Sequence, residues 1–286
     1  MNVNNTLRSF KDATVIITGG ASGIGKEFAK ELARQKAEVV IADLQLEAAE
    51  ALATEINSEG GKASSAMLDV CDATAVEELI RSTYKRTGRL DYMFNNAGIS
   101  HNMGSGFQSY ELSDWTKIIN VNLFGVIYGV QVAYEIMLKQ GFGHIVNTAS
   151  IAGLVCSPGM GSYVTTKHAV VGLSTTLRAE AAQFGINVSV LCPGAIRTPF
   201  IEGGKYSRNS QKMLKDDFLE MWEQHRPMAA DQFAREALVQ IKKNKGIIVL
   251  PKIWKLFWWL YRLSTSLSIT LGTKYFKPID SEVQKR

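Results

Sequence analysis

Cysteine is scarce in this chain of 286 residues. The three cysteines, Cys71, Cys156 and Cys192, form no C-x-x-C pair, and their number is odd. This pattern indicates neither a disulfide framework nor a zinc site, so we expect a reducing compartment. The first twelve residues also lack the apolar run of a signal peptide. We therefore predict a cytoplasmic protein.

Most of the chain also lacks an excess of charge. Of the 32 Lys and Arg residues, seven lie in 251–286, and of the 27 Asp and Glu residues, two lie there. The formal net charge of +5 therefore belongs to the C-terminal segment, and the first 250 residues are neutral overall. Net charge gives no support to a nucleic-acid groove in that part of the chain, so we expect no nucleic-acid partner.

What the sequence does contain is an alternation of strand and helix patterns. Apolar runs rich in β-branched residues occupy 13–18, 38–42, 90–94, 144–148, 186–191 and 247–250, with a weaker run at 63–68. Helical periodicity occupies 24–35, 45–58, 73–87, 114–139, 163–183 and 231–243. Strands that are apolar throughout are typical of a parallel sheet covered on both faces. We predict a doubly wound, Rossmann-type α/β fold.

Two segments interrupt this alternation. Residues 199–229 form a long polar and amphipathic insert, and residues 251–286 follow the last expected strand. We expect a single catalytic domain over residues 1–250, with a substrate lid at about 199–229 that hinges near the Gly203–Gly204 pair. Residues 251–286 form a basic, aromatic-rich extension.

The first expected strand runs into a glycine-rich loop. In TGGASGIG the key residues are Thr18, Gly19, Gly23 and Gly25, and the G-x-G-x-x-G fingerprint is absent. Glycines at these positions permit a tight turn and close approach of a phosphate, and the helix start that follows favours a pyrophosphate. Taken alone, the loop fits a plain strand–helix connection equally well.

An acidic residue ends the second expected strand. Asp43 lies about 20 residues beyond the loop, where a carboxylate binds the adenosine ribose in dinucleotide sites. The carboxylate would repel a 2′-phosphate, so we predict NAD rather than NADP. Lys26 is the opposing charge near the loop, and we interpret it as a solvated helix residue.

Six motifs together resemble the short-chain dehydrogenase/reductase family. They are TGGASGIG, FNNAG (94–98), NVNLFG (120–125), TASIAG (148–153), YVTTK (163–167) and CPGAIRT (192–198), in the family's order. The resemblance covers residues 10–200 by motif and 230–250 by fold. It implies a sheet of about seven parallel strands, a nicotinamide cofactor and a homodimer or homotetramer.

The resemblance also implies which residues bind the cofactor. Asn96 would line the adenosine side with its two neighbours, Asp69 would meet the adenine amino group, and residues 193–198 would hold the nicotinamide. The full predicted set is Gly19, Ser22, Gly23, Ile24, Gly25, Asp43, Leu44, Asp69, Val70, Asn96, Ala97, Gly98, Tyr163, Lys167, Pro193, Gly194, Ile196 and Thr198.

Tyr163 and Lys167 are the candidate acid–base pair. They are four residues apart in an expected helix and so share one face. A nearby ammonium stabilises phenolate, and we expect it to lower the pKa of Tyr163 from ~10 to about 7–8. Tyr163 would then exchange a proton with an alcohol or carbonyl oxygen while a hydride moves to or from the nicotinamide. Lys167 would also hold the cofactor ribose.

Ser150 and Asn122 complete the catalytic candidates. Ser150 follows a strand, and its hydroxyl can orient the reacting oxygen. By resemblance, Asn122 holds a water that relays protons to Lys167. Either residue taken singly would fit a structural role. The histidines show no ligand spacing, so no metal site is predicted; we interpret His144 as structural and His101 as a candidate for the substrate mouth.

The expected substrate walls are loops 99–107, 151–161 and 195–229, at the carboxyl ends of the strands. Their apolar residues are Ala152, Leu154, Cys156, Pro158 and Met160 in the middle loop and Phe200, Met213, Leu214, Phe218 and Trp222 in the lid. They indicate a lipophilic secondary alcohol or its ketone. The alternatives are a catalytically silent NAD(P)-binding regulatory or scaffold protein, an NADP-dependent ketone reductase, and an epimerase or dehydratase.

The C-terminal segment has an unusual composition. Five of the eight residues from 254 to 261 are aromatic, and Lys252, Lys255 and Arg262 lie among and beside them. Such a segment suits the surface of a membrane, and it equally suits packing on a partner subunit or beside the substrate pocket. The sequence leaves peripheral membrane contact through 251–263 and internal packing open.

Overall fold

The computed structural model describes residues 9–100, 107, 110–199, 223, 226–266, 269–270 and 273. Within these residues, seven parallel strands form one sheet in the order β3-β2-β1-β4-β5-β6-β9. The strands are β1 (Thr14–Thr18), β2 (Glu38–Asp43), β3 (Lys62–Met67), β4 (Tyr92–Asn95), β5 (Gly143–Thr148), β6 (Ile186–Pro193) and β9 (Ile247–Leu250). The predicted doubly wound α/β fold is confirmed.

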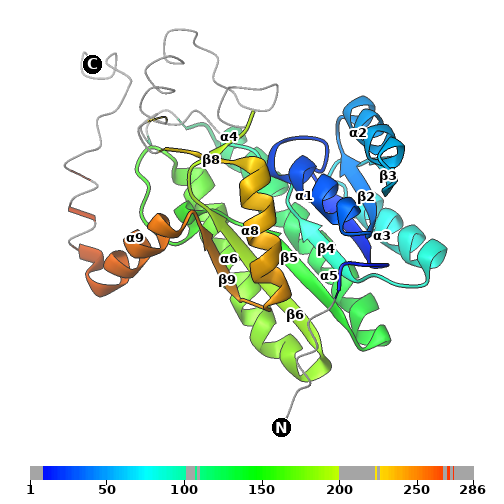
Figure 1. The fold of residues 1–286 in the computed structure, drawn as a ribbon. Helices are drawn as coiled ribbons and strands as arrows, with labels where there is room; N and C mark the ends of the chain where they lie inside the picture. Colours follow the sequence, from blue (N-terminus) through cyan, green and yellow to red (C-terminus); the bar gives the residue numbers. More distant parts are fainter. Residues whose placement is uncertain are drawn as a thin grey trace.

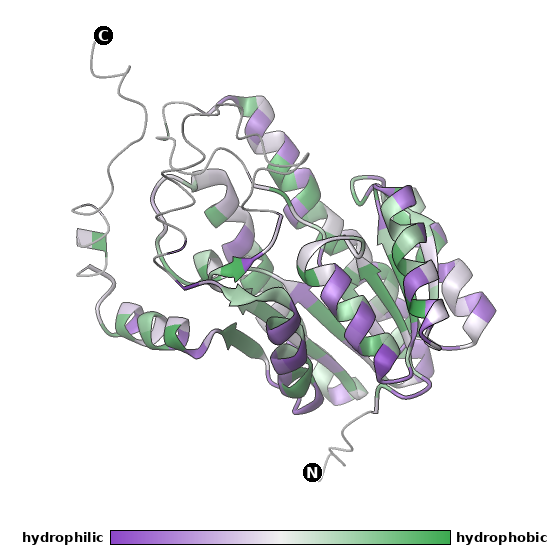
Figure 2. Ribbon diagram, turned by 45° about the horizontal axis from the view of Figure 1, so that its top comes forward, coloured by the Kyte–Doolittle hydropathy of each residue, from purple (hydrophilic) through white to green (hydrophobic). Residues whose placement is uncertain are grey.

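Helices cover both faces of this sheet (Figure 1). On one face lie α1 (Gly23–Arg34), α2 (Leu46–Ser58) and α8 (Ala230–Lys242); on the other lie α3 (Ala73–Thr87), α5 (Gly125–Gln140) and α6 (Gly161–Ala181). Successive strand residues point to opposite faces, so Val15 and Ile17 join the first core while Ile16 joins the second. Figure 2 shows hydrophobic strands in the interior and hydrophilic residues on the outer helix surfaces.

The expected helix at 114–139 is not continuous. It consists of α4 (Leu112–Ile119), a π-helical turn η2 (Asn120–Phe124) and α5. Hydrophobic periodicity cannot reveal one extra residue in a turn, and π-turns frequently mark functional sites. The span Leu112–Gln140 has the length and hydropathy of a membrane-crossing helix. It packs against α3, β4 and β5, so we interpret it as a core helix.

Two short strands were not predicted. β7 (Ile196–Arg197) follows β6 and pairs in parallel with β8 (Met228–Ala229), just before α8. Each has only two residues, too few to show a period in the sequence. Most of the predicted lid at 199–229, with its Gly203–Gly204 hinge, lies outside the described residues.

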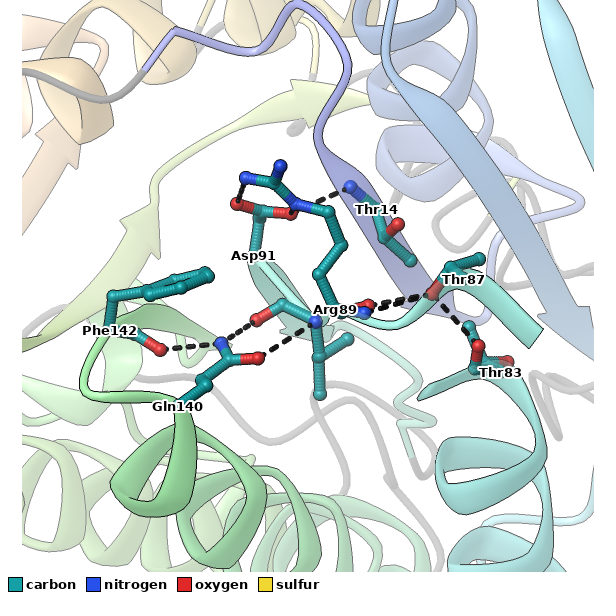
Figure 3. Close-up of polar contacts among 8 residues, drawn as sticks. Thr14, Thr83, Thr87, Arg89, Asp91, Gln140 and Phe142 are labelled. Carbon is teal, nitrogen blue, oxygen red and sulfur yellow. Dashed lines mark hydrogen bonds and ion pairs between the residues drawn. The ribbon is translucent and has the colours of Figure 1, made fainter. Parts of the chain in front are cut away.

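A polar network joins the elements at the amino edge of the sheet (Figure 3). The buried carboxylate of Asp91 accepts hydrogen bonds from the backbone N–H of Thr14 at 3.0 Å and from the Arg89 guanidinium at 2.7 Å. The Gln140 side chain donates to the carbonyl oxygens of Leu90 and Phe142, at 2.6 Å each. These contacts tie the starts of β1 and β4 to the end of α5.

The last described helix, α9 (Lys252–Leu263), leaves the end of β9 and lies at the periphery of the molecule (Figure 1). Trp254 and Trp258 pack against the second core. Most other side chains of α9 are exposed.

Candidate active site

A cavity of 1170 Å³ opens at the carboxyl ends of the strands. It lies where the strand order reverses, because β1 leads to β2 on one side and β4 leads to β5 on the other. Ligands of doubly wound folds bind at this switch point. Every predicted cofactor-binding residue lines the cavity except Gly25.

Gly19 and Gly25 shape the loop between β1 and α1. Gly19 has a φ of +61°, and a Cβ at this position would lie 2.8 Å from the Cα of Ala97. A Cβ at Gly25 would lie 2.1 Å from the carbonyl oxygen of Gly19. Gly25 therefore lets the helix start approach the strand and does not itself line the cavity, which is lined at this loop by Gly19, Ser22, Gly23 and Ile24.

The Asn96 side chain mainly connects two loops through hydrogen bonds. Its side-chain amide donates to the carbonyl oxygens of Thr18 at 3.1 Å and Gly19 at 3.2 Å. The Thr18 hydroxyl in turn accepts from the backbone N–H groups of Asn96 and Ala97, at 3.0 and 3.1 Å. These bonds fix the glycine loop against the end of β4, a role that the motif alone did not reveal.

The carboxylate of Asp43 is buried at the end of β2. One oxygen accepts from the backbone N–H of Ala21 at 2.9 Å, and the other accepts from that of Gln45 at 3.0 Å. A carboxylate at the rim of the cavity fits a ribose hydroxyl and disfavours a phosphate. Lys26 is half-buried on α1 and acts electrostatically on Glu55 of α2; its interpretation as a solvated helix residue stays a prediction.

Asp69 and Val70 line another part of the cavity wall. The exposed carboxylate of Asp69 accepts from the backbone N–H of Cys71 at 2.9 Å. Val70 is buried against α5, where a Cβ on Gly125 would lie 2.8 Å from it. This packing gives the cavity a fixed apolar surface beside one carboxylate.

The four catalytic candidates come from three elements, α6, η2 and η3. Tyr163 and Lys167 lie on α6, and the Lys167 ammonium is 5.5 Å from the Tyr163 ring centroid. The Tyr163 side chain is hydrogen-bonded to that of Ser150, at the N-terminus of the short helix η3 (Ile151–Gly153). Lys167 donates to the carbonyl oxygen of Thr148 at 2.9 Å. Tyr163, Lys167, Ser150 and Thr148 all line the cavity.

The expectation of a lowered tyrosine pKa was wrong for this arrangement. Burial raises the pKa of Tyr163 to about 12, against the lowering effect of its hydrogen bond to Ser150. Burial also lowers the pKa of Lys167 to about 8. Desolvation disfavours both charged forms, and the ammonium points at a backbone carbonyl rather than at the phenol. Lys167 makes no salt bridge to a described carboxylate.

Asn122 occupies the π-turn and does not line the cavity. Its side chain exchanges hydrogen bonds with Ile99, accepting from the N–H at 2.8 Å and donating to the carbonyl at 2.9 Å. Its amide also lies 3.4 Å from the Thr166 hydroxyl. A Cβ added to Gly98 would touch both the Asn122 side-chain oxygen and the Lys167 ammonium. The side chain thus reaches the surroundings of Lys167 while fixing the chain after β4.

The expected substrate walls did not include the C-terminal segment, whose packing the sequence left open, yet one wall of the cavity belongs to it. Four residues of α9 line the cavity: Trp254, Phe257, Leu260 and Tyr261. A Cβ on Gly194 would lie 2.1 Å from the Trp254 indole, so this glycine lets α9 pack onto the end of β6. The aromatic spacing signalled one helical face. The alternative of packing beside the pocket is therefore confirmed for this face.

The remaining predictions about the substrate side are only partly met. Ala152, Cys156 and Met160 line the cavity, whereas Leu154 is buried in the second core and neither it nor Pro158 lines the cavity. His101 and the five apolar lid residues lie outside the described residues. His144 is buried with its ring hydrogen-bonded to Ser189 at 2.8 Å, as its structural interpretation requires. The described residues contain no cluster that could hold a metal ion.

Comparisons with known proteins agree with this geometry. Residues 13–206 match the family model described as short chain dehydrogenase. Levodione reductase of Leifsonia aquatica is 35% identical over 72% of this chain and 75% of its own length. Cyclohexanol dehydrogenase of Acinetobacter sp. (strain SE19) is 38% identical over 67% of this chain and 76% of its own.

Solved structures extend the match to the three-dimensional fold. A short-chain dehydrogenase/reductase from Burkholderia phymatum, in complex with NAD, matches with a TM-score of 0.79 at 28% identity. That match covers 96% of this chain and 98% of the other. The levodione reductase crystal structure has a TM-score of 0.76 at 30% identity, covering 84% and 96%. The chain belongs to the short-chain dehydrogenase/reductase family of oxidoreductases, which act on CH–OH groups.

Proposed function

We propose that the protein uses NAD to interconvert a lipophilic secondary alcohol and its ketone, with Tyr163 as general acid and base. One observation carries this proposal. Tyr163, Ser150 and Lys167 line the same cavity as the glycine loop and Asp43. A proton-transfer group and a dinucleotide cradle in one cavity are the two parts that alcohol–ketone chemistry requires.

The residues present fit a nicotinamide dinucleotide. The first N–H groups of α1 lack acceptors within the helix, and Ser22 makes no side-chain cap hydrogen bond, so these donors are available to a pyrophosphate. The side chain of Asp43 suits the adenosine ribose, and Val70 gives an apolar surface for a base. When bound, the dinucleotide supplies the hydride acceptor or donor.

Each side chain then has a separate task at the reacting oxygen. Tyr163, with its pKa near 12, carries a proton at neutral pH and can give it to a ketone oxygen. The Ser150 hydroxyl hydrogen-bonds that oxygen and orients it. The Lys167 ammonium lies close enough to stabilise the phenolate that remains. Alcohol oxidation uses the same groups with the proton moving in the opposite direction.

The cavity walls favour a lipophilic substrate. Val155 and Met160 contribute apolar surface from the loop before α6, and Trp254 and Phe257 contribute it from α9. One relative is named a cyclohexanol dehydrogenase, so cyclic secondary alcohols are the first substrates to test. We also propose a cytoplasmic homodimer or homotetramer, whose size sedimentation velocity would give.

A substrate screen tests the function and separates its alternatives. Purified protein would be mixed with lipophilic secondary alcohols and NAD, or with their ketones and NADH, while absorbance at the NADH band is followed. Parallel reactions contain NADP or NADPH, and Tyr163→Phe is the control. We expect turnover with NAD that the control lacks. Tight dinucleotide binding without turnover of any substrate would support the silent-binding alternative, and faster turnover with NADPH would support the NADP-dependent reductase.

A further inference from the structure

The helix α9 has two faces with different surroundings. Trp254, Trp258 and Tyr261 are half-buried and face the body of the protein, where they pack on the second core or line the cavity. The opposite face carries Ile253, Leu256 and other apolar side chains that remain exposed. Figure 2 shows this helix at the edge of the molecule, with hydrophobic stretches between pale and hydrophilic ones.

The exposed face is an apolar stripe. Ile253, Leu256, Leu260 and Leu263 follow one another at helical spacing and are 55%, 55%, 53% and 79% exposed. Trp259, which is 53% exposed, lies beside them. Six of the fifteen large hydrophobic side chains that are exposed among the described residues belong to this one helix. Such a concentration marks an interaction surface, whereas scattered single residues do not.

Cations border this stripe. Lys252, Lys255 and Arg262 are exposed on α9, and the Arg262 guanidinium lies 5.4 Å from the Trp258 ring centroid and 5.9 Å from that of Trp259. The helix contains no Asp or Glu. Residues 251–286 also carry the whole net charge of the chain. The surface is therefore complementary to an apolar layer bordered by negative charge.

We propose that α9 docks on the surface of an anionic phospholipid bilayer. The stripe from Ile253 to Leu263 enters the acyl boundary, Trp259 sits at headgroup level, and the three cations meet lipid phosphates. A helix of 12 residues is about 18 Å long, well short of the roughly 30 Å needed to span a bilayer, so it lies in the interface plane. Docking two copies through this face would bring like charges together without an acidic partner on the helix.

This orientation has a consequence for the cavity. Phe257 and Leu260 line the cavity and are also 56% and 53% exposed, so the same helix is both cavity wall and docking surface. A docked protein would hold this wall against the lipid, where lipophilic alcohols accumulate. This last step rests on the proposed function, and the docking itself does not.

Vesicle flotation with the full-length protein tests the docking. We expect the protein to float with vesicles of phosphatidylcholine and phosphatidylglycerol and to stay behind with phosphatidylcholine alone. Ile253→Gln/Leu256→Gln/Leu263→Gln should weaken the partition coefficient by about a hundredfold. Lys252→Gln/Lys255→Gln should weaken it by about tenfold or more. None of these five residues lines the cavity.

Matched controls remove the same kinds of side chain elsewhere. Leu138→Gln/Phe184→Gln/Val239→Gln removes three other exposed apolar residues, and Lys243→Gln/Lys245→Gln removes two other exposed cations. Both controls should float like the wild type. Equal flotation of the α9 variants and the wild type would overturn the proposal. So would a change in sedimentation-velocity mass without a change in flotation, which would assign the stripe to a second copy of the chain. Dinucleotide binding by each variant, followed by fluorescence, reports the fold separately, and flotation requires no turnover.

Discussion

Buried charged groups have different partners at the two edges of the central sheet. At the amino edge, the buried carboxylate of Asp91 is met by the Arg89 guanidinium and by a backbone N–H group (Figure 3). At the carboxyl edge, the buried ammonium of Lys167 meets a neutral carbonyl oxygen, and burial shifts its pKa to about 8. A charge buried without an opposite charge costs stability.

This difference distinguishes the edge that stabilises the fold from the edge that carries the reactive groups. Satisfied polar networks stabilise a fold, whereas ionisable groups with perturbed pKa values gather where protons are moved. Both edges are formed by the same strands, so the contrast does not arise from a difference in fold. The contrast arises from the side chains that the sequence places next to the two ends of each strand. Substitutions at the two edges should therefore affect different properties, activity at one edge and stability at the other, and the largest effect is expected at Tyr163.

Tyr163→Phe should remove most of the activity without removing the fold. Loss of a positioned proton donor reduces kcat by about 10²–10⁴-fold, while one lost hydroxyl should change the free energy of unfolding by only about 1 kcal/mol. Steady-state kinetics and urea unfolding measure the two effects. Near-normal kcat would contradict the assignment of Tyr163 as acid and base.

Asp91→Ala should show the reverse behaviour. It leaves the N–H of Thr14 without this acceptor and removes the partner of Arg89, so we expect a loss of roughly 2–3 kcal/mol in the free energy of unfolding. The activity per folded molecule should not change. Asp231→Asn is the matched control, because its ion pair with Arg235 is exposed, and such pairs contribute at most about 1 kcal/mol. Similar losses in both variants would remove the distinction between a buried network and a surface pair.

Lys167→Met should change how the free energy of unfolding depends on pH, because it removes a buried charge that has no opposite charge beside it. The folded pKa of Lys167 is about 8 and the ordinary value is 10.5, so between these values the unfolded chain binds more protons and wild-type stability rises with pH. Relative to Lys167→Met, the wild type should gain about 2.6 kcal/mol from pH 8 to 10.5. Urea unfolding at several pH values measures this gain. Parallel curves for the two proteins would mean that Lys167 is not desolvated.

Asp43→Asn should change cofactor selection more than stability. The amide oxygen can still accept from one of the two N–H groups, that of Ala21 or that of Gln45, but the side chain no longer repels a 2′-phosphate. We expect the ratio of kcat/KM for NAD to that for NADP to fall about tenfold, or about 1.4 kcal/mol. Asp69→Asn is the comparison, because it should weaken both cofactors equally. A wild type that prefers NADP would refute the interpretation of Asp43.

Much of this site could be predicted because its signals are local. The T-G-x-x-x-G-x-G spacing, the Tyr163–Lys167 interval and the acid at the end of β2 each depend on neighbours within one strand–turn–helix unit. A helix fixes which residues share a face, and parallel strands fix which ends meet. Motif spacing together with the family resemblance therefore predicted a set of cofactor residues that all line one cavity, with the exception of Gly25.

Other features depend on contacts between distant segments. Asn96 ties the glycine loop, Asn122 holds Ile99 from within a π-turn, and Trp254 packs on Gly194 to close a cavity wall. None of these pairings leaves a period in the sequence. The pKa of Tyr163 also depends on distant segments, because burial by the surrounding elements raises it more than the hydrogen bond to Ser150 lowers it.

The sequence by itself determined the order of strands and helices, the family and the side chains available for chemistry, because hydrophobic period and motif spacing are properties of short segments. Only the tertiary structure decided the electrostatic state of Tyr163 and Lys167 and the wall that α9 supplies. Desolvation and cavity shape depend on how segments far apart in the chain exclude water together.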